Sequence, residues 1–205
     1  MPVIVVANPK GGVGKSTLST NIAGWLARQR HAVMLGDVDR QQSARQWLAL
    51  RPGAAAPIRS WEVERDHVVR PPKGTSHVVL DTPAGLRGKR LEAVMKIADR
   101  LLIPLQPSLF DIQATHAFVQ ALREHPRAAQ VALGLVAMRV KEHTHATTHL
   151  HEFTAALGVP VVAELRDTQN YVHLAARGLT LWDVAPGRIA RDLEQWLPLT
   201  EWLSR

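Results

Sequence analysis

Residues 3–17 decide the fold, and they read VIVVANPKGGVGKST. The uninterrupted apolar run Val3–Ala7 predicts a buried strand, and a glycine-rich loop follows it directly. Glycines allow the tight turn that points backbone N–H groups inward, and the helix after the loop adds its positive N-terminal end. The order of strand, glycine loop and Lys-Ser/Thr therefore predicts a cradle for nucleotide phosphates.

Each position of the loop has an expected task. Lys15 is expected to reach the β- and γ-phosphates, the Ser16 hydroxyl to ligate Mg²⁺, and Thr17 to support the α-phosphate. An ordinary phosphate loop needs a glycine at position 9, where this chain has Pro9, and it does not require Lys10. What remains is the variant K-G-G-x-G-K-[ST]. The residues assigned to the nucleotide are Gly11, Gly12, Val13, Gly14, Lys15, Ser16 and Thr17.

This variant resembles the deviant Walker A box of the ParA/MinD superfamily of ATPases, and in particular the small ParA-type partition proteins. The resemblance implies that Lys10 crosses a dimer interface to the ATP of the other subunit, so that two copies sandwich two nucleotides. A cation at the γ-phosphate would stabilise developing charge in the way an arginine finger does. The expected ligands are ATP and Mg²⁺, and the expected catalytic residues are Lys10, Lys15 and Asp39.

Acidic residues end two further predicted strands. Asp81 follows the apolar run His77–Leu80 and matches a Walker B carboxylate that holds Mg²⁺ through water. Asp37 and Asp39 follow the strand Ala32–Gly36, and alternate residues at a strand end share one face. The resemblance implies that Asp37 organises metal-bound water and Asp39 positions the attacking water. The expected metal-binding set is Ser16, Asp37 and Asp81.

Three other segments are assigned from the same resemblance. The family usually continues with Pro-Gln after the second aspartate, whereas this chain has Arg40 and Gln41. Residues 82–85, Thr-Pro-Ala-Gly, would form the switch loop that senses the γ-phosphate. The base is expected near Val136–Arg139 and the segment after Val162. Arg139 is either a stacking partner or a surface arginine, so the choice of adenine over guanine rests on the resemblance. Asn21 is either a brace for the switch loops or a helix-surface or core amide.

Strand and helix signals alternate along the whole chain. The predicted helices are Ser16–Arg30, Gln41–Leu50, Leu91–Asp99, Asp111–Glu124, Thr147–Leu157, Asn170–Arg177 and Gly187–Leu203, the last interrupted or bent at Pro198. The remaining predicted strands are Ile58–Val63, Arg100–Leu105, Val131–Met138 and Val159–Ala163. These signals predict an α/β fold, a three-layer α/β/α P-loop NTPase with a mostly parallel central sheet, in a single domain over residues 1–205.

Composition narrows the class of protein. The chain has 205 residues, of which 46% are hydrophobic and 21% charged, as expected of a soluble globular protein. It has no cysteine, which excludes disulfides, thiolate metal sites and the iron–sulfur branch of the superfamily. No apolar run approaches a membrane span and the N-terminus is unlike a signal peptide, so a cytoplasmic location is expected. The net charge of +7 fits two interpretations equally well: a polyanionic binding partner, or a general richness in arginine that has no role in binding.

The resemblance also implies partners. In small ParA-like proteins, basic C-terminal residues grip DNA phosphates once the dimer forms, without reading base sequence. The residues expected to do so here are Arg166, Arg177, Arg188 and Arg191. The expected function is an ATPase that dimerises on ATP, coats nucleoid DNA non-specifically and positions a cargo, namely a plasmid, a chromosome region or a protein body. A ParB-like or other cargo adaptor is expected to stimulate hydrolysis.

Two other functions stay open. One is a MinD-like regulator that cycles on a membrane through its C-terminal helix, although cancelling charges and Pro198 favour a helix packed on the domain and no stable membrane association. The other is a metabolic P-loop kinase or synthetase. Four histidines, His143, His145, His149 and His151, include a pair at metal-ligand spacing, but a solvated loop and helix start is favoured.

Overall fold

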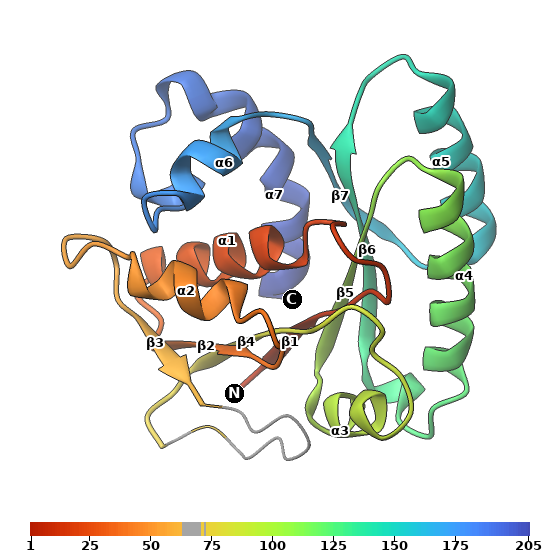
Figure 1. Cartoon of the computed structure of the whole chain (residues 1–205), viewed down its shortest axis with the longest axis horizontal. Helices are drawn as coiled ribbons and strands as arrows, with labels where there is room; N and C mark the ends of the chain where they lie inside the picture. Colours follow the sequence, from red (N-terminus) through yellow and green to blue (C-terminus); the bar gives the residue numbers. More distant parts are fainter. Residues whose placement is uncertain (63–70, 72) are drawn as a thin grey trace.

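The strands of the protein form one parallel sheet. The computed structural model describes residues 1–62, 71 and 73–205. Over these residues, seven strands pair in the order β3-β2-β4-β1-β5-β6-β7, and every pairing is parallel (Figure 1). The strands are β1 Val3–Val6, β2 Val33–Asp37, β3 Ile58–Trp61, β4 His77–Asp81, β5 Arg100–Leu105, β6 Ala132–Val140 and β7 Val161–Arg166.

Helices cover both faces of the sheet, which confirms the predicted three-layer fold (Figure 1). One face carries α1, α2, α6 and α7, and the other carries α3, α4 and α5. The helices are α1 Lys15–Arg28, α2 Ser43–Ala49, α3 Lys89–Ile97, α4 Leu109–Arg123, α5 His145–Leu157, α6 Asn170–Ala175 and α7 Ala190–Ser204. Short 3₁₀ turns are η1 Ala128–Gln130, η2 Leu181–Asp183 and η3 Gly187–Ile189.

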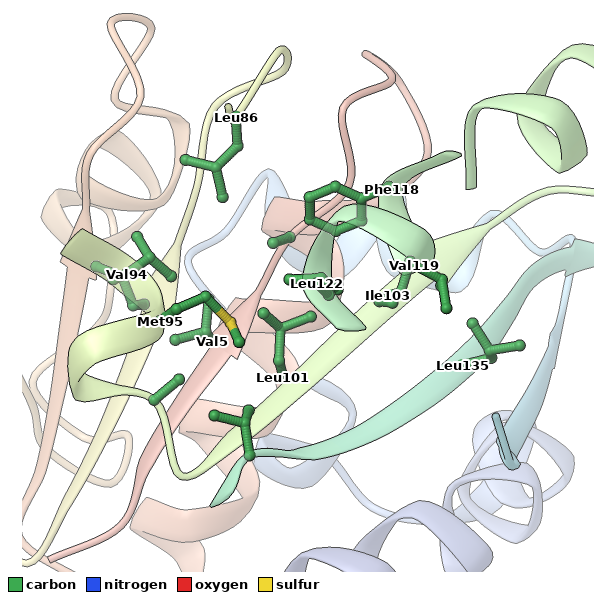
Figure 2. Packing of buried hydrophobic residues seen from close by; sticks show 14 of the residues in the cluster. Val5, Leu86, Val94, Met95, Leu101, Ile103, Phe118, Val119, Leu122 and Leu135 are labelled. Carbon is green, nitrogen blue, oxygen red and sulfur yellow. The ribbon is translucent and has the colours of Figure 1, made fainter. Parts of the chain in front are cut away.

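Alternation along the strands fills two separate cores. In β1, Val3 and Val5 pack toward α3 and α4, whereas Ile4 and Val6 pack toward α1. Figure 2 shows the first of these cores, with side chains of β1 and β5 gathered against Met95 of α3 and Phe118 of α4. Because both faces are buried, the strands are continuously apolar, which is why they are easy to find in the sequence.

Most helix and strand ends differ from the sequence-based prediction by a few residues, and two prolines and one strand end need separate comment. The expected interruption at Pro198 is not observed: α7 continues through it, with buried Trp196 and Leu199 anchoring the helix on either side. The last strand begins at Val161 rather than Val159, because Pro160 has no N–H to donate to the ladder. The strand predicted over residues 58–63 is observed to Trp61, and Val63 lies outside the described residues.

The C-terminal helix packs on the sheet, as predicted. Trp196, Leu199 and Leu203 of α7 are buried in the core on the α1 face. None of the helices that the structure describes is long and apolar enough to cross a membrane.

Candidate nucleotide-binding site

A cavity of about 730 Å³ opens at the carboxyl edge of the sheet, within the size range of small-molecule sites. In parallel α/β sheets, ligands bind at this edge. The phosphate loop, the segment after β2 and the segment after β4 meet there. The described lining includes Gly11, Gly12, Gly14, Lys15, Ser16, Thr17, Asp39, Arg40, Gln41, Pro83, Ala84, Arg90 and Arg139.

The loop between β1 and α1 needs its glycines. Gly12 and Gly14 have φ angles of +76° and +96°, in the left-handed region that side chains disfavour. A Cβ on Gly14 would also lie 2.7 Å from Cε of Met138. Helix α1 begins directly afterwards without a capping side chain from the described part of the chain, so its first N–H groups remain available to an anion.

Lys15 is held inside this cradle. Its side chain is buried, and Nζ donates to the Lys10 carbonyl oxygen at 2.7 Å. Burial lowers the pKa of Lys15, and the charges of Asp81 and Asp39 offset part of that effect. Burial removes the water that would stabilise the Lys15 ammonium. The negative charge of a phosphate bound in the glycine loop would stabilise it instead.

Asp81, at the end of β4, is a buried carboxyl group only 1% exposed. Ser19 Oγ donates to its Oδ1 at 3.2 Å. Burial raises the pKa of Asp81 to about 7, and the hydrogen bond from Ser16 opposes the rise. The carboxyl group and the neighbouring hydroxyl supply the hard oxygen atoms that Mg²⁺ prefers, and a bound cation would offset the cost of ionising this buried group. The residues present therefore fit a magnesium–nucleotide complex.

The raised pKa of Asp81 gives a pH-dependence that can be measured. The folded chain holds this proton more tightly than the unfolded chain, so stability is lost as pH rises from about 4 to about 7. The asparagine of an Asp81→Asn variant is uncharged at every pH. Without nucleotide and metal, this variant is therefore expected to have a Tm about 3–6 °C above that of the parent chain at mildly alkaline pH. At acidic pH, where Asp81 is itself protonated, the increase is expected to be much smaller. Thermal unfolding followed at both pH values tests this, and an equal shift at both would contradict it.

Asp37 is the last residue of β2 and Asp39 follows two residues later, but their contacts differ. Asp37 Oδ2 accepts the N–H groups of Ala44 at 2.8 Å and Arg45 at 3.2 Å, so this carboxylate also caps α2. Its Oδ1 accepts the N–H of Asp39 at 2.9 Å, and burial raises its pKa. Asp39 itself lines the cavity. Asp37 thus fixes the backbone from which the Asp39 side chain extends.

Arg139 lines the cavity from a strand that does not neighbour those carrying the acids. It belongs to β6. In the sheet, β5 separates β6 from β1, whereas β4 and β2 lie on the other side of β1. A register shift between Met138 and Val140 and a φ of +54° take Arg139 out of the regular ladder, and it lines the cavity. Residues 136–138 are buried, so within residues 136–139 only Arg139 is exposed to the cavity.

The expected switch loop contacts the phosphate loop. The Gly85 N–H donates to the Pro9 carbonyl oxygen at 2.8 Å, and the Thr82 hydroxyl donates to the Val6 carbonyl oxygen at 2.9 Å. Asn21 is a core amide and not a brace for this loop, because its Oδ1 accepts the Leu181 N–H in η2. The switch loop is therefore joined to the start of the phosphate loop by one backbone hydrogen bond and to the end of β1 by the Thr82 side chain.

The C-terminal arginines lie outside the cavity lining and differ in their pairing. Arg166 Nε donates to buried Asp192 Oδ1 at 2.5 Å, and Arg191 Nη2 donates to Glu142 Oε1 at 2.6 Å. Arg177 and Arg188 are exposed, and neither forms an ion pair with the residues that the structure describes. The four histidines are exposed as predicted, and His151 Nε2 lies 2.9 Å from Glu164 Oε1.

Sequence reasoning missed two residues that hold the phosphate loop. Asn8 is fully buried and bonds to the loop, β5 and α4. Gln106, at the end of β5, donates its Nε2 to the Gly12 carbonyl oxygen at 2.8 Å. The only feature of the sequence that draws attention to Asn8 is its place directly after an apolar strand. That place does not reveal its hydrogen-bond partners in β5 and α4.

A family model described as the CobQ/CobB/MinD/ParA nucleotide binding domain matches residues 4–181. Two curated relatives are both named maintenance of carboxysome distribution protein A. The one from Gloeobacter kilaueensis is 39% identical over 113 residues, which cover 54% of this chain and 51% of that protein. The one from Halothiobacillus neapolitanus is 28% identical over 199 residues, which cover 92% of this chain and 91% of that protein. The matched part is thus about half of the first relative and nearly all of the second.

Solved structures share the fold at low identity. The cell division ATPase MinD of Pyrococcus furiosus has a TM-score of 0.76 at 16% identity, over 99% of this chain and 98% of that one. A Cyanothece McdA variant in complex with ATP has a TM-score of 0.73 at 16% identity, over 98% of this chain and 96% of that one. At these identities the likeness establishes the three-layer fold alone.

Proposed function

This chain belongs to the CobQ/CobB/MinD/ParA nucleotide-binding domain family, and from that premise we propose that it is a ParA-type ATPase that positions a cargo. ATP binding would close two copies face to face, the dimer would hold DNA without sequence preference, and an adaptor on the cargo would stimulate hydrolysis. Hydrolysis would then open the dimer and release the DNA.

The observation that carries this proposal is the second lysine of the loop. The Lys10 backbone is fixed beside the cavity, because its carbonyl oxygen accepts from Lys15 and its N–H donates to Asn8. Its own ammonium forms no ion pair within the described ranges. Lys15 already provides the ammonium that one nucleotide needs, so Lys10 remains free to serve the nucleotide of a second copy.

The other cavity residues divide the remaining tasks. The loop amides and Lys15 would bind the phosphates, and Asp39 would orient the attacking water. Ser16 and Asp81 would hold Mg²⁺ directly or through water, and Asp37 would act through water. When bound, Mg²⁺ supplies positive charge that neutralises phosphate oxygens. Arg139 would contact the base.

For the cargo, we propose a protein body in preference to a plasmid or a chromosome region. Both relatives described above carry the name of a carboxysome distribution protein, and one aligns over 92% of this chain. A protein named ParA from Rhizobium radiobacter and the chromosome-partitioning ATPase Soj of Thermus thermophilus are 25% and 26% identical over shorter alignments, so DNA cargo is the second candidate.

The fold disfavours membrane cycling through the C-terminal helix. Trp196, Leu199 and Leu203, the apolar side chains that a membrane anchor would use, are buried against the sheet. Liposome flotation with ATP separates this alternative from DNA binding. Hydrolysis that depends on a small metabolite, and not on DNA or a protein partner, would instead indicate a kinase or synthetase.

DNA binding is tested by reversing two exposed charges. Arg177→Glu with Arg188→Glu is expected to weaken ATP-dependent binding to random-sequence DNA by about tenfold or more, because phosphate contacts dominate such binding. Arg166 and Arg191 already pair with acids and are expected to contribute less. Gel shifts over a range of salt concentrations measure the effect. Lys96→Glu on α3, exposed on the opposite layer, is the control for a single charge reversal, and it is compared with Arg177→Glu and Arg188→Glu made one at a time. Unchanged binding by the double variant would remove these arginines from the DNA surface.

A further inference from the structure

Asn8 connects the start of the phosphate loop to two distant elements. It is 0% exposed and lies between the end of β1 and Lys10. Its Oδ1 accepts the Lys10 N–H at 2.9 Å, and its Nδ2 donates to the Pro104 carbonyl oxygen at 2.8 Å and the Thr115 hydroxyl at 3.1 Å. Pro104 is in β5 and Thr115 is in α4. One side chain thus ties the first loop residue to two elements about a hundred residues away.

We infer that Asn8 is a positioning residue that sets the direction in which Lys10 leaves the fold. The inference rests on the proposed function, because it concerns the service of Lys10 to a second copy. A lysine side chain is long and flexible, so where its ammonium can reach depends on how firmly its backbone is held. Asn8 connects the Lys10 backbone to β5 and α4, which belong to the protein core, and not to another part of the loop.

The binding of nucleotide makes this contact more important. Two side chains now hold the Lys10 backbone: Asn8 at the N–H and Lys15 at the carbonyl oxygen. Lys15 is the residue proposed to turn to the phosphates, and it would then leave the Lys10 carbonyl. Of the two anchors, Asn8 remains in the state in which the dimer forms.

An asparagine suits this position because the site needs an acceptor and donors on one short side chain. An aspartate would accept from Lys10 but could not donate to Pro104. An alanine would leave the part-buried Lys10 N–H and two buried acceptors without this partner. Thr115 is also 0% exposed, so its hydroxyl fixes the amide of Asn8 from the opposite side.

The test compares dimer formation in two variants with a matched control. With a non-hydrolysable ATP analogue and Mg²⁺, Asn8→Ala is expected to weaken dimerisation by about tenfold or more, and Thr115→Val by about threefold to fivefold. Sedimentation velocity measures both. Thr154→Val is the control, since Thr154 is a buried threonine of α5 whose hydroxyl donates within its own helix, to the His151 carbonyl oxygen at 3.1 Å. It is expected to dimerise like the parent chain.

A second measurement separates positioning from general support of the loop. In a Lys10→Ala background, where the proposed dimer is absent, adding Asn8→Ala is expected to weaken the nucleotide affinity of single copies by a smaller factor than it weakens dimerisation of the parent chain. The reason is that the loop contact of Asn8 is at position 10, outside the Gly11–Thr17 cradle. Parallel losses of single-copy affinity and dimer affinity would overturn the inference, as would normal dimerisation of both Asn8→Ala and Thr115→Val. If Lys10→Ala itself dimerises normally, the proposed function fails instead. Thr115→Val keeps the shape of the side chain, so it remains informative if Asn8→Ala does not fold.

Discussion

A Lys10→Ala chain is expected to bind ATP as a single copy and to remain monomeric. Lys15, the loop glycines and the start of α1 are unchanged by the substitution, so the nucleotide keeps its own cradle. What disappears is the ammonium proposed to reach the nucleotide of the other copy, and losing a buried charge contact of this kind weakens association by about 100-fold or more. Light scattering with a non-hydrolysable analogue is expected to give about the 22.6 kDa of one chain, where the parent gives about twice that mass.

Two comparisons show that the effect belongs to the charge at position 10. Lys15→Ala is also expected to stay monomeric, but because it no longer holds nucleotide, so equilibrium binding of a fluorescent ATP analogue distinguishes the two variants. Since the chain has no cysteine, Lys10→Cys introduces a single thiol that can be aminoethylated to a close analogue of lysine. Alkylation is expected to restore the dimer. Failure of a fully alkylated chain to dimerise would argue against the role of the ammonium.

Asp39→Ala is expected to form the ATP dimer and to keep it. The carboxylate lines the cavity, and its Oδ1 accepts the Gln41 N–H at 3.1 Å, which holds it near the end of β2. Without a group to orient the attacking water, hydrolysis is expected to fall by about 100-fold or more while nucleotide binding persists. Phosphate release measures the first effect, and the lifetime of the dimer on DNA after removal of free ATP measures the second.

The matched control for this loss is Asp167→Ala. Asp167 is an exposed carboxylate outside the described cavity lining, and its Oδ2 lies 3.8 Å from Lys141 Nζ. It is expected to hydrolyse ATP at the parent rate. Normal turnover by Asp39→Ala, with the control behaving as expected, would remove the role assigned to Asp39.

The phosphate loop and the acidic strand ends could be predicted because their signals are local. A buried strand followed by glycines and Lys-Ser fixes the backbone of the loop, and the φ angles of Gly12 and Gly14 are those that only such a sequence permits at low cost. Asp37 and Asp81 end parallel strands, so a shared sheet edge could be expected from the sequence, and the structure pairs these two residues directly.

What the sequence could not provide are contacts between distant segments. The capping of α2 by Asp37 depends on where that helix begins, and the anchoring of Lys10 by Asn8 depends on β5 and α4. Arg166 looks like a free cation in the sequence, yet it pairs with Asp192, a buried carboxylate from α7. The number of basic residues in the sequence therefore indicates a polyanionic partner. The folded structure is needed to see which of these residues already pair with an acid.

A crystal structure with Mg²⁺ and a non-hydrolysable ATP analogue would show directly which nucleotide each Lys10 contacts. We expect two copies related by a two-fold axis, with the carboxyl edges of their sheets facing and each Lys10 ammonium in contact with the phosphates held by the other copy. Isolated copies with Lys10 extended into solvent, or a dimer in which Lys10 touches only the nucleotide of its own chain, would contradict the proposed arrangement.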